Sequence, residues 1–247
     1  MKRAERNFFI GTSGWNYETF IGTLYERSTP QRKYLECYTK FFNTVELNAS
    51  FYRSFPKKTW EGWYKRTPKD FLWSVKASRF ITHIKRLNAD EESIDKFFSM
   101  ATILKEKLAV VLFQLPPSLE YDQKVFDAFL SLLPNDVRIS LEPRHDSWFK
   151  EEVYAKLKKR NIALVFSHTA GRYPFKEVYT ADFLYIRLHG MESLYRGAYG
   201  YEGLRPWIKI IESFSGDSYI YFDNTADGSA AQDALLLKKI LHEHFRD

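Results

Sequence analysis

The 247-residue chain has little of several features that mark large protein classes. It contains a single cysteine, Cys37, which excludes an intramolecular disulfide and a cysteine-rich zinc module. No apolar run reaches the roughly 18 residues that a membrane-spanning helix needs, and the N-terminal segment MKRAERNFFIG has no long apolar stretch. We therefore expect a cytoplasmic protein without a membrane partner, in which Cys37 is a small core residue.

The short motifs of several enzyme classes are also missing. The segment GTSGW, which follows the first apolar run, has neither the spacing of a glycine-rich dinucleotide fingerprint nor that of the GxSxG serine-hydrolase elbow. No HExxH or DxD ligand spacing occurs. We therefore predict no cofactor and no metal ligand, and keep a divalent metal only within one alternative function.

The chain does have many aromatic and basic residues. Aromatic residues make up 17%, which supplies ample material for a core. Lysine and arginine number 37 against 31 aspartate and glutamate, for a formal charge of +6 and a sequence pI near 9.1. This excess favours anionic partners such as phosphate esters or nucleic acid, and is equally typical of a solvated basic surface. Nothing in the sequence fixes an oligomeric state.

Short runs rich in Val, Ile, Phe and Tyr alternate with stretches of helical periodicity, which is typical of strands buried on both faces between helices. Helical patterns cover 94–108, 122–133 and 204–211, and a last helix runs through Ala234, Leu237, Leu241 and Phe245; Asp90 is the expected N-cap of the first. Segment 169–182 is irregular, so the sixth unit is expected to be abbreviated. The eight predicted strands are 8–13, 44–51, 71–77, 109–115, 138–142, 163–167, 183–189 and 218–222.

Eight such alternations in about 250 residues predict an α/β fold, a single (β/α)₈ TIM-type barrel forming one domain over 1–247. An open doubly wound sheet is the structural alternative. In a barrel, the carboxyl ends of the strands form the active-site face. Polar residues gather at those ends in nearly every predicted strand, where side chains two residues apart share a face.

This distribution defines the candidate site. The predicted catalytic residues are Glu142, His189, Lys76 and Glu46. The predicted substrate-binding residues are Arg144, Arg187, Asn48, Gln114, His145, Trp15, Tyr52, Trp148 and Asn224. The same groups are also compatible with a buried salt-bridge network that fills the barrel.

Seven segments together resemble one family. They are GTSGWNY (11–17), TVELNASFY (44–52), FLWSVKASRFITH (71–83), LFQLPPS (112–118), EPRHDSW (142–148), RLHG (187–190) and YIYFDNTADG (219–228). In this order they are similar to the YecE-like family of uncharacterised TIM barrels, domain of unknown function 72. The resemblance implies a TIM barrel but no established reaction. One departure is Asp223, where the pattern usually has asparagine.

Three functions follow from these residues. The first is an enzyme that uses acid–base chemistry on a small anionic or polyhydroxylated, sugar-like substrate, with Glu142 or His189 as the base and the arginines binding a carboxylate or phosphate. The second is a divalent-metal phosphodiesterase or nucleic-acid-binding barrel resembling endonuclease IV. The third is a non-catalytic protein that binds an anionic ligand. A Schiff-base reaction would require Lys76 to be desolvated with a lowered pKa.

Overall fold

Two parallel sheets form the centre of the computed structural model, which describes residues 6–245. In the first sheet the order is β2 (Thr44–Leu47), β3 (Leu72–Lys76), β4 (Leu108–Gln114), β5 (Arg138–Glu142) and β6 (Ala163–Leu164). In the second it is β1 (Phe8–Thr12), β9 (Asp217–Phe222), β8 (Phe183–Leu188) and β7 (Phe166–His168). All pairings between these strands are parallel. The predicted α/β class with parallel strands is therefore confirmed.

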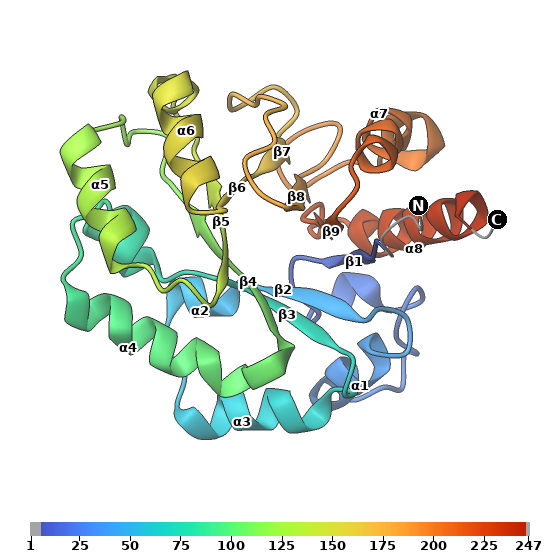
Figure 1. Ribbon diagram of the computed structural model, residues 1–247. Coiled ribbons are helices and arrows are strands. Elements are labelled where there is room, and N and C mark those ends of the chain that lie inside the picture. The colour runs from blue at the N-terminus through green and yellow to red at the C-terminus, as the bar shows by residue number, and fades with distance from the viewer. Residues whose placement is uncertain (1–5, 246–247) are drawn as a thin grey trace.

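Helices surround the strands, and those from residue 57 onward follow one another around the outside in chain order (Figure 1). Their outer position agrees with the strands being buried on both faces, as parallel sheets require. The α-helices are α1 (Tyr34–Tyr38), α2 (Ala49–Tyr52), α3 (Lys57–Arg66), α4 (Glu91–Ala101), α5 (Gln123–Leu132), α6 (Glu151–Lys159), α7 (Gly200–Ser213) and α8 (Ser229–His244). Short 3₁₀ or π turns are η1 (Glu18–Phe20), η2 (Gln31–Lys33), η3 (Phe80–Ile84), η4 (Thr102–Lys107) and η5 (Asp146–Trp148).

Side chains alternate between two faces along each strand. One face packs against the helices in two large apolar clusters, to which Trp73 and Phe113 belong. The other, which we call the inner face, carries a third apolar cluster that includes Val110 and Leu112 from one sheet and Tyr185 and Tyr221 from the other. Because both sheets contribute to this cluster, their inner faces pack against each other. Any polar side chain on this face at the carboxyl ends of the strands is therefore directed into one shared region.

β1 and β2 are neighbours without a backbone ladder between them. The Tyr38 hydroxyl connects them, because it accepts from the Thr12 amide at 2.9 Å and donates to the Thr44 carbonyl at 3.1 Å. Gly11 permits this approach: a Cβ there would lie 2.4 Å from the Thr44 carbonyl oxygen. β6 and β7 are separated only by Val165, whose amide donates to Leu141 of β5. The two sheets therefore meet at both of their edges.

Two element predictions were wrong in extent. The strand predicted over 44–51 ends at Leu47, because Asn48 adopts helical angles and starts α2. Ser50 secures this helix by donating to the Lys76 carbonyl at 2.8 Å. The helix predicted over 94–108 runs from Glu91 to Ala101 and continues as 3₁₀ turns in which Lys105 has a φ of 51°. Asp90 does cap α4, accepting from the Ser93 amide at 2.8 Å.

The strand predicted over 163–167 is divided at Val165 into β6 and β7, which belong to different sheets. The other predicted elements agree closely with the structure. Segment 169–182 contains no helix, as its irregular sequence indicated. The helix predicted over 204–211 extends to Gly200–Ser213 and continues past Pro206. The last helix begins earlier than its apolar pattern suggested, at Ser229, after Gly228 in a left-handed conformation with a φ of 83°.

Candidate functional site

The carboxyl ends of β2, β5, β8 and β9 bring six charged or ionisable side chains together. We call them the charged cluster: Glu46, Glu142, Arg144, Arg187, His189 and Asp223. None is more than 8% exposed. They meet because each lies on the inner face, two residues from a neighbour that faces the same way. Five of the predicted catalytic and binding residues are therefore in direct contact with one another or with a shared partner: Glu46, Glu142, His189, Arg144 and Arg187.

Arg187 is the centre of this cluster. Its Nε and Nη2 hold Glu46, with the shortest distance 2.8 Å between Nη2 and Oε1. Its Nη1 donates to Glu142 Oε2 at 2.8 Å, and its Nη2 donates to Asp223 Oδ2 at 3.0 Å. Three carboxylates from three strands thus surround one guanidinium that is 1% exposed. Charge-assisted bonds of this kind are strong and directional, so the arrangement is rigid.

The carboxylate oxygens of the two glutamates also accept hydrogen bonds from side chains other than Arg187. Glu46 accepts from Ser13 Oγ at 2.7 Å and from the Tyr185 hydroxyl at 2.7 Å. Glu142 Oε1 accepts from Arg144 Nε at 2.9 Å. Burial opposes the charged form of Glu142, but Arg144 and Arg187 outweigh it and hold the pKa of this carboxyl well below its usual range. Glu142 is therefore ionised at neutral pH and is a poor general base, which works best with a pKa near the working pH.

His189 is fully buried and neutral. Its Nε2 lies 3.1 Å from Arg187 Nη1, and because a guanidinium can only donate, Nε2 must accept and the proton resides on Nδ1. That Nδ1 is 3.0 Å from Asp223 Oδ2 but is not directed well enough for a hydrogen bond. Burial and the charge of Arg187 lower the pKa of His189. Because the His189 ring is fully buried, a ligand cannot reach it. Its contact with Arg187 Nη1 instead holds the guanidinium in position.

Lys76, at the end of β3, differs from the rest of the site. Among residues 6–245 its Nζ has no hydrogen-bond or ion-pair partner, and it lies 4.2 Å from the centre of the Phe51 ring. The side chain is 9% exposed, and Nζ is not sealed from solvent. Burial and then the charge of Arg187 lower the pKa of Lys76 to about 8. Lys76 is therefore a cation with unused donors and a pKa near neutrality.

Other basic and aromatic groups surround Lys76. The Phe51 ring that it contacts also packs edge-on against His83, at 4.9 Å between ring centres. Burial and the charges of Lys76 and Arg144 lower the pKa of His83 to about 4, so this ring is neutral at pH 7. Arg144 lies over Tyr173, with Cζ 4.7 Å from the ring centre. This part of the site therefore has a positive potential, while every carboxylate of the charged cluster is already ion-paired.

A loop after β8 borders the same region. Gly190 has a φ of 124°, and a Cβ there would lie 2.1 Å from the Arg196 carbonyl oxygen, so only glycine fits. Tyr195 is 40% exposed and its ring lies 5.8 Å from that of His189. Asn224 holds the loop, since its Nδ2 donates to the Gly197 carbonyl at 3.0 Å. Asn224, predicted to bind substrate, here positions a loop.

The other predicted binding residues make no hydrogen bond or ion pair with the charged cluster. Gln114 donates to the carbonyl of its neighbour Leu115 at 2.5 Å. Asn48 has a buried Oδ1 without a hydrogen-bond partner, the signature of a group with unused capacity. Trp15 packs edge-on against Trp73 on the helix side of the strands, 5.3 Å between ring centres.

Three further residues lie away from the charged cluster's contacts. Tyr52 was expected just after the strand predicted over 44–51, but that strand ends at Leu47, and Tyr52 is 77% exposed as the last residue of α2. Trp148 is 1% exposed in the apolar packing next to α5, and its Nε1 donates to the Leu119 carbonyl. His145 contacts Ser147 through Nδ1. The turn η5 directs Trp148 outward, so the sequence EPRHDSW leaves the inner face after Arg144.

Sequence reasoning missed Tyr185 and Phe51. Tyr185 lies two residues before Arg187 on the same strand, so the two-residue alternation could have found it. Phe51 was hidden by the strand expected over 44–51. Phe51 faces Lys76 because α2 follows directly after β2, and no turn residue in the sequence predicts that the strand ends there.

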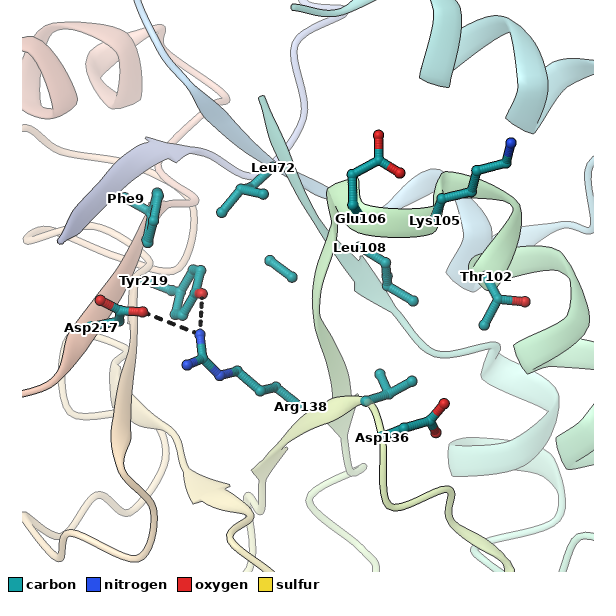
Figure 2. A pocket seen from close by; sticks show the side chains of 12 residues that line it. Phe9, Leu72, Thr102, Lys105, Glu106, Leu108, Asp136, Arg138, Asp217 and Tyr219 are labelled. Carbon is teal, nitrogen blue, oxygen red and sulfur yellow. Dashed lines mark hydrogen bonds and ion pairs between the residues drawn. The ribbon is translucent and has the colours of Figure 1, made fainter. Parts of the chain in front are cut away.

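A cavity of about 500 Å³ lies at the opposite, amino-terminal ends of the strands. Figure 2 shows Arg138 reaching Asp217 and Tyr219 at one side of it, with Phe9 and Leu72 nearby. Arg138 Nη1 is 2.7 Å from the Tyr219 hydroxyl and 3.3 Å from Asp217. Because active sites in such folds lie at the carboxyl ends of the strands, we place the candidate site at the charged cluster.

Neither a group of side chains fit to hold a metal ion nor a membrane-spanning helix occurs among residues 6–245. No three His, Cys, Asp or Glu side chains in this range are arranged to hold a metal ion. The acidic groups of the charged cluster instead surround the guanidinium of Arg187. None of the described helices is long and apolar enough to cross a membrane.

Comparison with known proteins identifies relatives along nearly the whole chain. A family model described as a protein of unknown function, DUF72, matches residues 9–247. The UPF0759 protein YunF of Bacillus subtilis (strain 168) is 28% identical over 94% of each chain. The crystal structure of a DUF72 family protein from Thermotoga maritima is similar with a TM-score of 0.84 and 28% identity, over 96% of this chain and 100% of that one. A DUF72 family protein from Enterococcus faecalis, 21% identical over 95% of each chain, has a TM-score of 0.82 and supports the fold alone.

Proposed function

The chain belongs to the DUF72 family, as its motifs predicted, and we propose that it is an enzyme that uses acid–base chemistry on a small anionic substrate at the carboxyl ends of its strands. The observation that carries this proposal is the unpartnered Lys76, located where every carboxylate of the charged cluster is already ion-paired. A carboxylate or phosphate would supply the acceptor that the structure does not provide to Nζ.

The roles of the residues follow from their contacts. Lys76 and Arg144 bind the anionic group, since Arg144 uses only Nε and Nη2 on Glu142 and keeps Nη1 for a ligand. Lys76 is also the acid–base group, because its pKa of about 8 lies closer to neutrality than that of Glu142. Glu46, Arg187 and His189 are positioning residues that fix the site's geometry and charge.

We also propose that the two sheets close into a single eight-stranded barrel, in one domain. Supporting this are the Tyr38 hydroxyl between β1 and β2 and the short break at Val165 between β6 and β7. The shared apolar cluster of the inner face is the expected filling of a small barrel. In such a barrel the charged cluster and Lys76 face a single opening.

Isothermal titration calorimetry with phosphate and malonate tests the anion site. We expect Lys76→Met to weaken binding at least about tenfold, or about 1.4 kcal/mol, because a charge-assisted contact is lost. Lys85→Met is the matched control, since Lys85 is an exposed lysine whose Nζ contacts the Phe80 ring, as that of Lys76 contacts Phe51. Equal affinities of wild type and Lys76→Met would contradict the proposal. Tight binding of a metabolite without its conversion, followed by NMR, would instead favour the non-catalytic receptor.

A further inference from the structure

We propose that the Lys76 amine is a nucleophile that forms a covalent imine with a carbonyl compound bearing a carboxylate or phosphate group. This deepens the proposed function and rests on it, because the same pocket must first bind the anionic group. It assigns a substrate class, aldehydes or ketones with an adjacent anion, and a bond-forming role to one atom, Lys76 Nζ.

The first support is the absence of competing bonds at Nζ. An amine that donates to carboxylates or carbonyls must break those contacts before its lone pair can attack. Lys107 is such a case: it is 4% exposed, and its Nζ donates to the Tyr64 and Thr67 carbonyls at 2.7 and 2.8 Å. Lys76 has no such contact among the described residues and only the Phe51 ring beside it.

The second support is that the surroundings favour the neutral amine. The Lys76 side chain is about nine-tenths buried, and this burial is the largest cause of its lowered pKa. Arg187 and Arg144 also lower this pKa, while Glu142 and Asp223 act in the opposite direction. With a pKa of about 8, roughly a tenth of this amine is unprotonated at pH 7, against fewer than about one in a thousand for an ordinary lysine. Desolvation and a neighbouring cation are the known means of activating a lysine for attack on a carbonyl.

The third support is the neighbouring arginine. Arg144 Nη1 has no partner among residues 6–245, whereas its Nε and Nη2 are held by Glu142. Lys76 ends β3 and Arg144 follows the end of β5, so the two side chains come from the carboxyl ends of the strands on either side of β4. The charge of Arg144 also lowers the pKa of Lys76. A substrate with its carbonyl next to an anionic group can therefore place the anion on Arg144 and the carbonyl carbon near Nζ.

The reaction balances without an external oxidant or reductant. The Nζ lone pair forms a bond to the carbonyl carbon while the C=O π electrons move to oxygen. The amine first releases one proton to solvent, which frees the lone pair, and after the attack a proton passes from nitrogen to that oxygen to give a carbinolamine. The hydroxyl then takes a proton back from solvent and leaves as water while the nitrogen lone pair forms the C=N bond. Protonated amine and carbonyl compound thus give a protonated imine and one water. The imine draws electrons from the adjacent carbon, which is the step that lysine-dependent enzymes use to activate it.

Reductive trapping tests the inference directly. The full-length protein is incubated at pH 7.5 with glyoxylate, an aldehyde carrying a carboxylate, or with acetaldehyde, in the presence of sodium cyanoborohydride, and modified lysines are mapped by mass spectrometry. We expect glyoxylate to modify Lys76 at least about tenfold faster than Lys85, and malonate to slow this reaction. Lys76→Arg should abolish the fast adduct, and Lys85→Arg should leave it unchanged.

The possible results are distinct. Modification of Lys76 no faster than that of Lys85 overturns the nucleophile, even if calorimetry shows that malonate binds, and the anion site then stands alone. Equal rates with acetaldehyde and glyoxylate overturn the anionic substrate class. If neither binding nor trapping occurs, the proposed function fails together with the inference. Peptide mapping of the wild type needs no variant, so a folding defect in Lys76→Arg would not obscure the outcome.

Discussion

Replacing Lys76 by methionine should stabilise the protein. Folding moves this amine from water into a site where its pKa falls from 10.5 to about 8. At about 1.4 kcal/mol per pKa unit, the charged form loses about 3 kcal/mol. Methionine has a similar length and no charge, and forfeits only the contact with Phe51, worth about 0.5–1 kcal/mol. We therefore expect a gain of about 2 kcal/mol in the free energy of unfolding near pH 7, or roughly 4–8 °C in melting temperature.

The pH dependence has a definite sign. Because the folded-state pKa of Lys76 is lower than the unfolded-state value, the unfolded chain binds more protons between about pH 8 and 10.5. The stability of the wild type due to this group therefore rises with pH across that window. The advantage of Lys76→Met should be complete below pH 8 and should disappear above about pH 10.5.

Urea unfolding followed by tryptophan fluorescence, at pH 7 and pH 10.5, measures both effects. Lys107→Met is the matched control, because it also removes a buried lysine but leaves the Tyr64 and Thr67 carbonyls without their donor. It should lose about 1–3 kcal/mol. A Lys76→Met variant no more stable than the wild type at pH 7, or equally stabilised at both pH values, would refute the account of Lys76 as a desolvated cation.

Three further outcomes are expected. Arg187→Met should lose about 3–5 kcal/mol in urea unfolding, because buried carboxylates lose their shared cation; a loss below 1 kcal/mol would contradict this. The stability of the wild type should fall as the pH drops below about 4.5, because Glu142 has a lowered pKa in the folded state and takes up a proton when the chain unfolds. Glu142→Gln should make this decline less steep in acid titrations. Tyr38→Phe should cost about 1–3 kcal/mol and speed hydrogen exchange at the Thr12 amide, and unchanged exchange would argue against a bridging role for the hydroxyl.

The charged cluster was predictable because it depends on local alternation. Arg187 and His189, or Glu142 and Arg144, lie two residues apart near a strand end, and parallel strands bring such ends together. The sequence left open whether these groups form a salt-bridge network or a catalytic site. The structure shows the network for most of them, with Lys76 outside it.

The remaining errors have a common physical origin. Tyr52 and Trp148 were assigned to the site because they follow polar strand ends, but the backbone turns into α2 at Asn48 in one case and into η5 at Asp146 in the other. Where a loop turns is decided by contacts distant in sequence, such as that of Ser50 with the Lys76 carbonyl. The missing partner of Lys76 is likewise a property of everything packed around it, and no sequence pattern encodes it.

The central position of Arg187 also has a consequence for how the chain folds. Its carboxylate partners lie at positions 46, 142 and 223, so the cluster forms only after strands from the beginning, middle and end of the chain have come together. A one-residue slip of β8 would turn Arg187 toward the apolar packing of the helices, where its charge would be unpaired. Arg187 thus disfavours any state in which β8 is out of register. The last of these strands to dock completes both the charged cluster and the fold.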